Sequence, residues 1–199
     1  GEPGISFVYD SIPQQLEQEL QGLKRRGESL RMVLFNTACD CFIGLERLDD
    51  LARECLEILQ HHSIFTTLST KGLPSLKTLE VLARRPELSL LNYSLSSLSQ
   101  GFRTHFEPLV PPVEDCLDML TQACRLKVNV RARVEPLIPM ENDSEEDLVS
   151  LFKELSRAGI REAVVSYLTM GKDVRHRLER RLPRAHLNML NHWFKNPEG

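Results

Sequence analysis

Residues 128–135 read Val128-Asn129-Val130-Arg131-Ala132-Arg133-Val134-Glu135, an unbroken alternation of apolar and polar side chains. A β-strand repeats every two residues, so one face of this segment is apolar and the other carries an amide and three charges. A parallel strand buried on both faces would instead be apolar throughout. The charged face therefore indicates a polar cavity, such as the mouth of a barrel interior, or else an edge strand with one face in solvent.

The rest of the chain alternates β-type runs with amphipathic runs. Six runs are strand candidates: Ile5–Tyr9, Arg31–Asn36, Ile64–Ser69, Leu88–Leu95, Val128–Val134 and Arg161–Ser166. Between them lie apolar residues at helical spacing. The clearest set is Leu148, Leu151, Phe152 and Leu155, which follows a helix-capping residue at Asp143 or Ser144.

Strict alternation of strands and helices predicts parallel strands joined by right-handed crossovers. Six such units are too few for a closed eight-stranded barrel, so a doubly wound sheet and a partial barrel both remain. In either case we expect an α/β fold of parallel strands. From Lys172 onward the pattern is helical with a turn near Pro183, so residues 171–199 are expected to form a C-terminal helical extension.

The composition of the 199 residues is that of an ordinary globular protein, with 41% apolar and 27% charged residues. The net charge of −3 argues neither for nor against a polyanionic partner. No apolar run approaches the ~20 residues of a membrane-spanning helix, and the start of the sequence shows no signal peptide, so no membrane association is expected. The five cysteines are odd in number and contain no Cys-x-x-Cys pair, which fits a reduced, cytoplasmic setting.

Polar residues stand at several strand ends, where the functional site of a parallel α/β protein lies. These residues are Asp40, Glu46, Lys71, Ser94 and Arg133. Each has an ordinary explanation on its own: a turn aspartate, a glutamate in the first turn of a helix, a solvated lysine, a capping serine or a solvated strand face. Because Asp40, Lys71, Ser94 and Arg133 lie near the carboxyl ends of four successive strands, we expect these four side chains to face one polar hollow.

Two cysteines, Cys39 and Cys41, lie in the turn that contains Asp40. A Cys-x-Cys pair without further partners at ligand spacing is weak evidence for a metal, so no metal ligand is predicted. A phosphate-binding barrel enzyme that uses Lys71 and Arg133 is a further alternative. The absence of a GxGxxG or P-loop motif counts against it.

The same strand ends carry a resemblance to a known family. Asp40-Cys41-Phe42-Ile43-Gly44-Leu45-Glu46 resembles the Asp-x-x-x-x-x-Glu turn of the spore photoproduct lyase-like branch of the radical S-adenosylmethionine (radical SAM) enzymes. Leu68-Ser69-Thr70-Lys71 is similar to the branch's Thr-Lys strand end, and Tyr93-Ser94-Leu95 to the polar end of its next strand. Phe106-Glu107-Pro108 and Arg133-Val134-Glu135-Pro136-Leu137-Ile138-Pro139 resemble its Glu-Pro…Arg-x-x-Pro-x-x-Pro pattern. The match spans roughly residues 5–170 and rests on the order and spacing of these motifs.

The resemblance implies a partial (β/α)6 TIM-like barrel over residues 1–170, whose mouth binds S-adenosylmethionine beside a four-iron, four-sulfur (4Fe-4S) cluster. It implies that Lys71 and Ser94 contact the amino-acid end of this cofactor, and that Asp40 and Glu46 shape the pocket near Cys39, the residue placed at the reaction centre. Arg133 would lie on the inner wall and contact a carboxylate or phosphate. The family's reaction is reductive cleavage of the cofactor to a 5′-deoxyadenosyl radical, and the substrate of the named branch is a DNA photolesion.

One departure from the family is serious, because its cluster-binding Cys-x-x-x-Cys-x-x-Cys motif is absent from the sequence. Either the chain is part of a longer enzyme, or it is a relative that lacks the cluster. We expect these 199 residues alone neither to assemble the cluster nor to cleave the cofactor.

Two functions therefore stay open. The first is radical chemistry in an intact parent enzyme, with nucleic acid as a partner through the basic run at residues 172–186, which could equally be a solvated helix face. The second is a non-catalytic α/β binding or regulatory domain that retains the ligand pocket.

Overall fold

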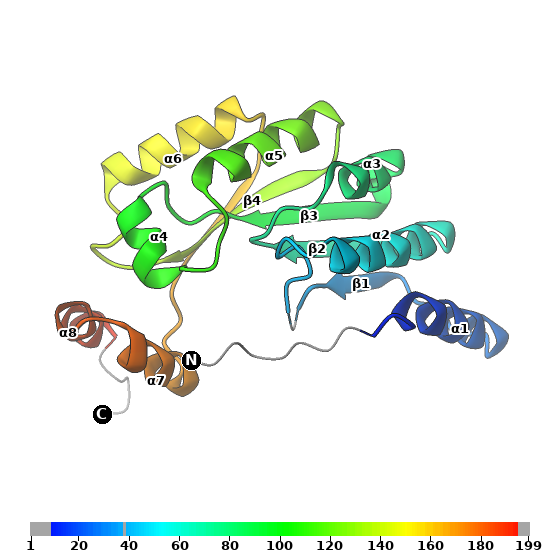
Figure 1. The fold of residues 1–199 in the computed structure, drawn as a ribbon, viewed down its shortest axis with the longest axis horizontal. Helices are drawn as coiled ribbons and strands as arrows, with labels where there is room; N and C mark the ends of the chain where they lie inside the picture. Colours follow the sequence, from blue (N-terminus) through cyan, green and yellow to red (C-terminus); the bar gives the residue numbers. More distant parts are fainter. Residues whose placement is uncertain (1–8, 38, 195–199) are drawn as a thin grey trace.

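The computed structural model describes residues 9–37 and 39–194 and contains one sheet of five parallel strands (Figure 1). The strands follow one another across the sheet in chain order, as right-handed crossovers between neighbours require. They are β1 (Met32–Phe35), β2 (Phe65–Thr70), β3 (Ser89–Ser94), β4 (Val130–Leu137) and β5 (Ala163–Tyr167). Five of the six strand candidates are thus confirmed. The sixth, Ile5–Tyr9, lies outside the described residues except for Tyr9, which belongs to no strand.

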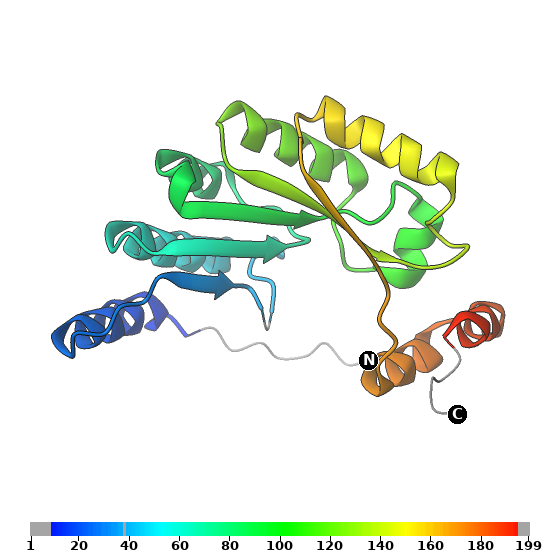
Figure 2. The ribbon, with the colours of Figure 1, turned by 180° about the vertical axis from the view of Figure 1, so that it is seen from behind.

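The crossover helices cover one face of the sheet, and Figure 2 shows the strands in front of them from the opposite side. These helices are α2 (Glu46–His61), α3 (Leu76–Arg84), α5 (Val113–Arg125) and α6 (Glu145–Arg157), while α1 (Ile12–Arg25) lies beside α2. A doubly wound sheet would carry helices on both faces. One-sided coverage instead agrees with the expected partial TIM-like barrel, and the described residues form an open α/β sheet.

Local sequence signals set the helix ends as expected. Ser144 caps α6, because its hydroxyl accepts a hydrogen bond from the backbone N–H of Asp147 at 3.1 Å. The chain leaves α6 through Gly159, whose φ of +100° is accessible to glycine at little cost. A Cβ at this position would also lie 2.9 Å from Cβ of Cys124, so both the turn and the packing require glycine.

Alternate strand residues point into the core beneath the helices. Ala132 and Val134 of β4 are fully buried there, together with Leu91 and Tyr93 of β3 and Leu68 of β2. The intervening charged residues of β4 therefore occupy the uncovered face. Because β4 lies between β3 and β5, the interpretation of residues 128–135 as an edge strand is wrong. The charged face belongs to an interior strand of the open sheet.

Three further helices lie at and beyond the carboxyl edge of the sheet: α4 (Gln100–Phe106), α7 (Lys172–Arg181) and α8 (Arg184–Trp193). The last two confirm the expected helical segment with its turn near Pro183. They form a second small core in which Phe102 of α4 packs with Leu182 and Leu190. No helix in the described part of the chain is long and apolar enough to span a membrane.

Candidate functional site

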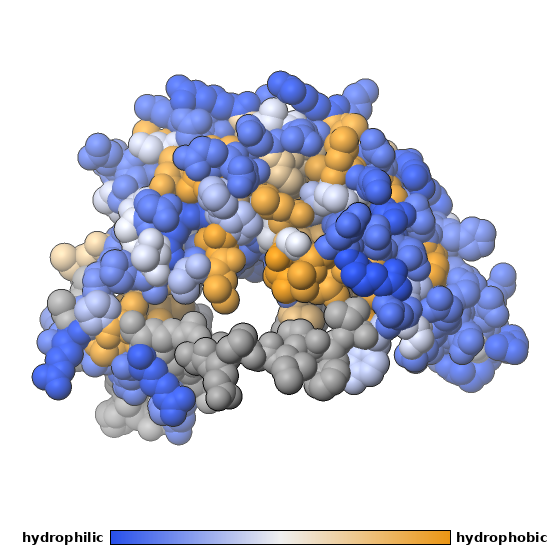
Figure 3. Space-filling view, viewed as in Figure 1, coloured by the Kyte–Doolittle hydropathy of each residue, from blue (hydrophilic) through white to orange (hydrophobic). Residues whose placement is uncertain are grey.

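A cavity of about 640 Å³ opens at the carboxyl ends of β1, β2 and β3. Its walls come from the β1–α2 loop, the β2–α3 loop, the end of β3 and the α4–α5 loop. The lining residues are Asn36, Thr37, Cys39, Asp40, Phe42, Ile43, Gly44, Ser69, Thr70, Lys71, Gly72, Leu73, Ser94, Leu109, Val110 and Pro111. Figure 3 shows apolar side chains on both sides of a hollow in the face of the molecule seen in Figure 1. A mostly apolar concavity with a few convergent polar groups is the usual form of a small-molecule site.

Asp40 joins the first two of these loops. Its carboxylate accepts hydrogen bonds from the backbone N–H groups of Lys71 at 2.8 Å and Gly72 at 3.2 Å, and from the Thr70 hydroxyl at 2.7 Å. It also accepts the N–H of Phe42 at 3.0 Å within its own turn. Most of the hydrogen-bonding capacity of the Asp40 carboxylate is thus taken up by groups of the protein. Its role in the structure is to hold together the loops that form the cavity.

Gly72 allows the two loops to approach each other closely. A Cβ at this position would lie 2.0 Å from the carbonyl oxygen of Phe42 and 2.6 Å from its carbonyl carbon. The same carbonyl accepts the N–H of Leu73 at 3.0 Å. Any side chain would separate these backbone segments, so glycine is required for the packing of the loops.

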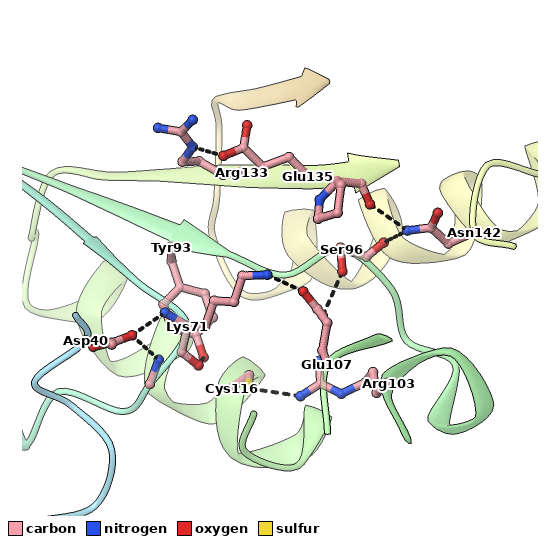
Figure 4. A network of polar contacts seen from close by, with 12 residues as sticks. Asp40, Lys71, Tyr93, Ser96, Arg103, Glu107, Cys116, Arg133, Glu135 and Asn142 are labelled. Carbon is pink, nitrogen blue, oxygen red and sulfur yellow. Dashed lines mark hydrogen bonds and ion pairs between the residues drawn. The ribbon is translucent and has the colours of Figure 1, made fainter. Parts of the chain in front are cut away.

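Lys71 extends from the end of β2 across to the α4–α5 connection. Its ammonium forms an ion pair with Glu107, whose second carboxylate oxygen accepts the Ser96 hydroxyl at 2.8 Å (Figure 4). The Glu107 side chain is only 7% exposed, whereas that of Lys71 is 39% exposed. The lysine is therefore anchored on its buried side and remains accessible to a ligand.

Ser94 and Arg133 are paired in register on neighbouring strands. Ser94 lines the cavity, but Arg133 does not, and it forms an ion pair with Glu135 farther along the open face. Burial alone would raise the pKa of Glu135. The hydrogen bonds from Arg133 and Ser166, with the positive charges of Arg133 and Lys71, outweigh burial and leave that pKa below its usual value.

Glu46 is the exposed first residue of α2 and lines a separate hollow of about 400 Å³ with Asp49 and Lys77. Of the six predicted site residues, the cavity brings together Cys39, Asp40, Lys71 and Ser94, while Glu46 and Arg133 lie outside its wall. The ligand-binding roles of all six stay predictions.

Sequence reasoning missed three buried polar residues that support the site. Glu107 anchors Lys71, Arg103 donates to the carbonyl of Pro111 in the cavity wall, and the Asn142 amide donates to the carbonyl of Ser96 at 2.9 Å. Glu107 belongs to the Glu-Pro motif, so the sequence drew attention to this residue but did not indicate that it pairs with Lys71. The other two residues carry no local signal, because their partners lie 8 and 46 residues away.

The cysteines do not form a metal centre in the described part of the chain, where no three His, Cys, Asp or Glu side chains come together to hold an ion. Cys39 is exposed at the cavity, whereas the Cys41 thiol donates to the Asn36 side-chain oxygen at 3.0 Å. Burial raises the pKa of Cys41 to about 12, so it is held as a thiol rather than as the thiolate that metals bind. The residues present do not fit an iron–sulfur cluster.

Comparison with known proteins gives one sequence relative and several similar folds. No family model matches the chain. An uncharacterized protein, ORF301, of Acidianus two-tailed virus is 23% identical over 156 residues, which cover 77% of this chain and 51% of that protein. The chain therefore spans about half the length of this relative.

Solved structures share the fold at low sequence identity. Streptococcus suis SuiB bound to S-adenosylmethionine is 16% identical with a TM-score of 0.61, covering 98% of this chain and 42% of that one. A spore photoproduct lyase variant with bound S-adenosylmethionine and dinucleoside spore photoproduct is 16% identical with a TM-score of 0.62, covering 89% and 57%. A domain of a pyruvate-formate lyase-activating enzyme from Bacteroides vulgatus is 18% identical with a TM-score of 0.51, covering 78% and 92%. At these identities the likeness is one of fold, and it agrees with the α/β fold expected from the sequence.

Proposed function

We propose that the chain is the barrel portion of a radical SAM enzyme and that S-adenosylmethionine binds in the cavity at the carboxyl ends of β1–β3. One observation carries this proposal: Cys39, Asp40, Lys71 and Ser94, which come from three separate strand ends, line a single concavity. Ligands of parallel α/β folds bind at this edge. The volume of about 640 Å³ lies within the usual range for small-molecule sites.

The lining residues suit the two ends of this cofactor differently. Lys71 supplies a positive charge and Ser94 a hydroxyl, which are appropriate partners for an α-amino acid carboxylate. Phe42 and Val110 supply apolar surface for a nucleoside. Asp40 acts through the loops it joins, because its carboxylate already accepts several backbone N–H groups.

The cluster of such enzymes supplies the electron for cofactor cleavage, and the five cysteines of this chain do not fit it. We therefore assign no step to it here. The misfit also favours a second candidate function, a non-catalytic binding domain that uses the same cavity. Iron analysis after anaerobic reconstitution distinguishes the two: four irons per chain would contradict the cluster-less interpretation.

For the first candidate we propose a dinucleoside photolesion as the substrate class, in line with the spore photoproduct lyase resemblance. The division of the chain at residue 170 and a cytoplasmic location are part of the same proposal. The basic run at residues 172–186 would then meet phosphates, and affinity for single-stranded DNA would fall steeply with salt concentration. A salt-independent or undetectable affinity, measured by filter binding, would contradict this partner.

Isothermal titration calorimetry with S-adenosylmethionine and S-adenosylhomocysteine tests the proposed site directly. We expect binding of both, and a loss of about 10- to 100-fold in Lys71→Met, the range that a hydrogen bond to a charged group supplies. Lys153→Met, at an exposed position on α6, is the matched control and should bind as the wild type does. Absence of binding by the wild type, or equal losses in both variants, would refute the site.

A further inference from the structure

Glu107 is a buried carboxylate at the end of α4, and both of its oxygens have a partner. Lys71 pairs with Oε1, and the Ser96 hydroxyl donates to Oε2. A buried charge is costly to leave unpaired, so Glu107 and Lys71 depend on each other. With 7% of its side chain exposed, Glu107 does not line the cavity wall, whereas its partner Lys71 does.

Three connections of the fold meet at this carboxylate, as Figure 4 shows. Lys71 comes from the β2–α3 loop, Ser96 from the β3–α4 loop, and Glu107 begins the α4–α5 loop that lines the cavity with Leu109 and Val110. Arg103, one turn earlier, fixes the far end of the same loop through the carbonyl of Pro111. The position of Glu107 therefore determines both the place of the ammonium and the place of one cavity wall.

Lys71 has a second carboxylate within electrostatic range. The positive charge of Lys71 contributes to the lowered pKa of Glu135, although hydrogen bonds from Arg133 and Ser166 contribute more. Glu135 lies on β4, on the open face of the sheet and outside the cavity wall. Glu135 is therefore an alternative carboxylate partner, outside the cavity wall, for a Lys71 ammonium that has lost Glu107.

We propose that Glu107 is the positioning residue of the cavity: it holds the Lys71 ammonium at the wall, where the remaining ammonium protons bind a ligand carboxylate. The ligand part of this inference rests on the proposed S-adenosylmethionine site. Glu107 itself does not touch the ligand, and its effect on binding passes through Lys71.

Glu107→Gln is the informative variant, because glutamine keeps the size and can keep the Ser96 contact while it removes the charge. Two ligands separate positioning from general damage: S-adenosylhomocysteine carries the amino-acid carboxylate, and 5′-methylthioadenosine lacks it. We expect calorimetry to show about a 10-fold loss for the first ligand and less than a 2-fold change for the second. Glu114→Gln, at an exposed position in the first turn of α5, is the matched control.

Three results of this titration would overturn the inference. Equal losses for both ligands would mean that Glu107 only stabilises the fold. Tighter binding of S-adenosylhomocysteine would mean that Glu107 competes with the ligand for Lys71. Unchanged affinities would mean that the ammonium keeps its place without Glu107.

A second measurement decides the inference without any ligand, and so separates its failure from that of the proposed function. Carbon-13 NMR follows the titration of the Glu135 carboxyl in the wild type, Glu107→Gln, Lys71→Met and the double variant. Loss of the Glu107 charge alone lowers the pKa of Glu135 in both backgrounds. We expect a larger downward shift when Lys71 is present, because the released ammonium moves toward Glu135. Equal shifts in the two backgrounds would refute the positioning role, even if S-adenosylmethionine binds.

Discussion

Replacement of Asp40 by asparagine should destabilise the protein through the backbone rather than through a lost ligand contact. Asp40 Oδ2 accepts the N–H groups of Lys71 at 2.8 Å and Gly72 at 3.2 Å. In Asp40→Asn one carboxylate oxygen becomes an NH₂ group, which cannot accept a hydrogen bond. At the Oδ2 position the NH₂ group would face the N–H groups of Lys71 and Gly72, and at the Oδ1 position it would face the N–H of Phe42. Either orientation leaves at least one N–H without its acceptor, and an unsatisfied buried donor costs about 1–3 kcal/mol, which is the loss we expect. That is a large share of the ~5–15 kcal/mol by which domains are stable.

Urea unfolding at pH 7 measures this loss, and hydrogen exchange locates it. The amides that lose their acceptor should exchange faster in Asp40→Asn: those of Lys71 and Gly72 if the NH₂ group takes the Oδ2 position, or that of Phe42 if it takes the Oδ1 position. Asp50→Asn is the control, since Asp50 forms a partly exposed ion pair with Arg53 one turn along α2 and should contribute less. If the two variants unfold at the same urea concentration, and the amides of Phe42, Lys71 and Gly72 exchange at the wild-type rate in Asp40→Asn, then Asp40 does not hold the loops. A direct ligand contact then becomes the better explanation.

Three further predictions follow from the same loops and the open face. Gly72→Ala should lower the free energy of unfolding by about 1–3 kcal/mol in urea titrations, because its Cβ would overlap a backbone carbonyl, while Gly171→Ala, which meets no atom within 4 Å, should change it far less. A thiol reagent at pH 7.5, followed by peptide mass mapping, should label Cys39 in the folded protein and spare Cys41, whose burial raises its pKa to about 12; equal labelling would contradict the burial. The pKa of Glu135 is lowered in the fold, so the contribution of its charge to stability is fully present above the ordinary pKa of 4.5 and is lost as the pH falls through the folded value. The difference in unfolding free energy between the wild type and Glu135→Gln should therefore be constant at pH 6–8 and shrink below pH 4.5. A constant difference down to pH 3 would contradict the lowered pKa.

The sheet could be predicted from the sequence because its signals are local. Alternation at residues 128–135 fixed which side chains of β4 face the core, and Ala132 and Val134 are indeed fully buried. The order of β-type and helical runs implied parallel strands, and parallel strands place their carboxyl ends at one edge. This rule alone brought Asp40, Lys71 and Ser94 together, and the structure confirms that they share a cavity.

The partners of these residues could not be predicted, because each partner is distant in sequence. The sequence pattern indicates a turn residue at Asp40, and it does accept hydrogen bonds from the nearby Asn36 and Phe42. Three further donors, on Thr70, Lys71 and Gly72, lie 30 to 32 residues onward. The sequence around Lys71 is that of a solvated lysine, because no neighbouring residue indicates that its carboxylate partner lies 36 residues away. Arg133 was expected on the cavity wall, but Glu135, two residues along the same strand face, takes its guanidinium. Strand-end rules give the location of a group, whereas charge pairing decides what that group can still bind.

The two carboxylates beside the cavity therefore have different effects on a ligand. Asp40 accepts hydrogen bonds mainly from neutral N–H and O–H donors, so its negative charge is stabilised without being cancelled and remains at the cavity wall. Glu107 pairs with the Lys71 ammonium, so it neutralises the positive charge of Lys71 as well as fixing the position of that group. Among the described lining residues Lys71 is the one cation. In the proposed site the carboxylate of S-adenosylmethionine would therefore pair with Lys71, and its sulfonium would meet the remaining negative charge of Asp40. The neutral thioether of S-adenosylhomocysteine lacks that second attraction, so the proposal predicts tighter binding of S-adenosylmethionine in the same calorimetric titration.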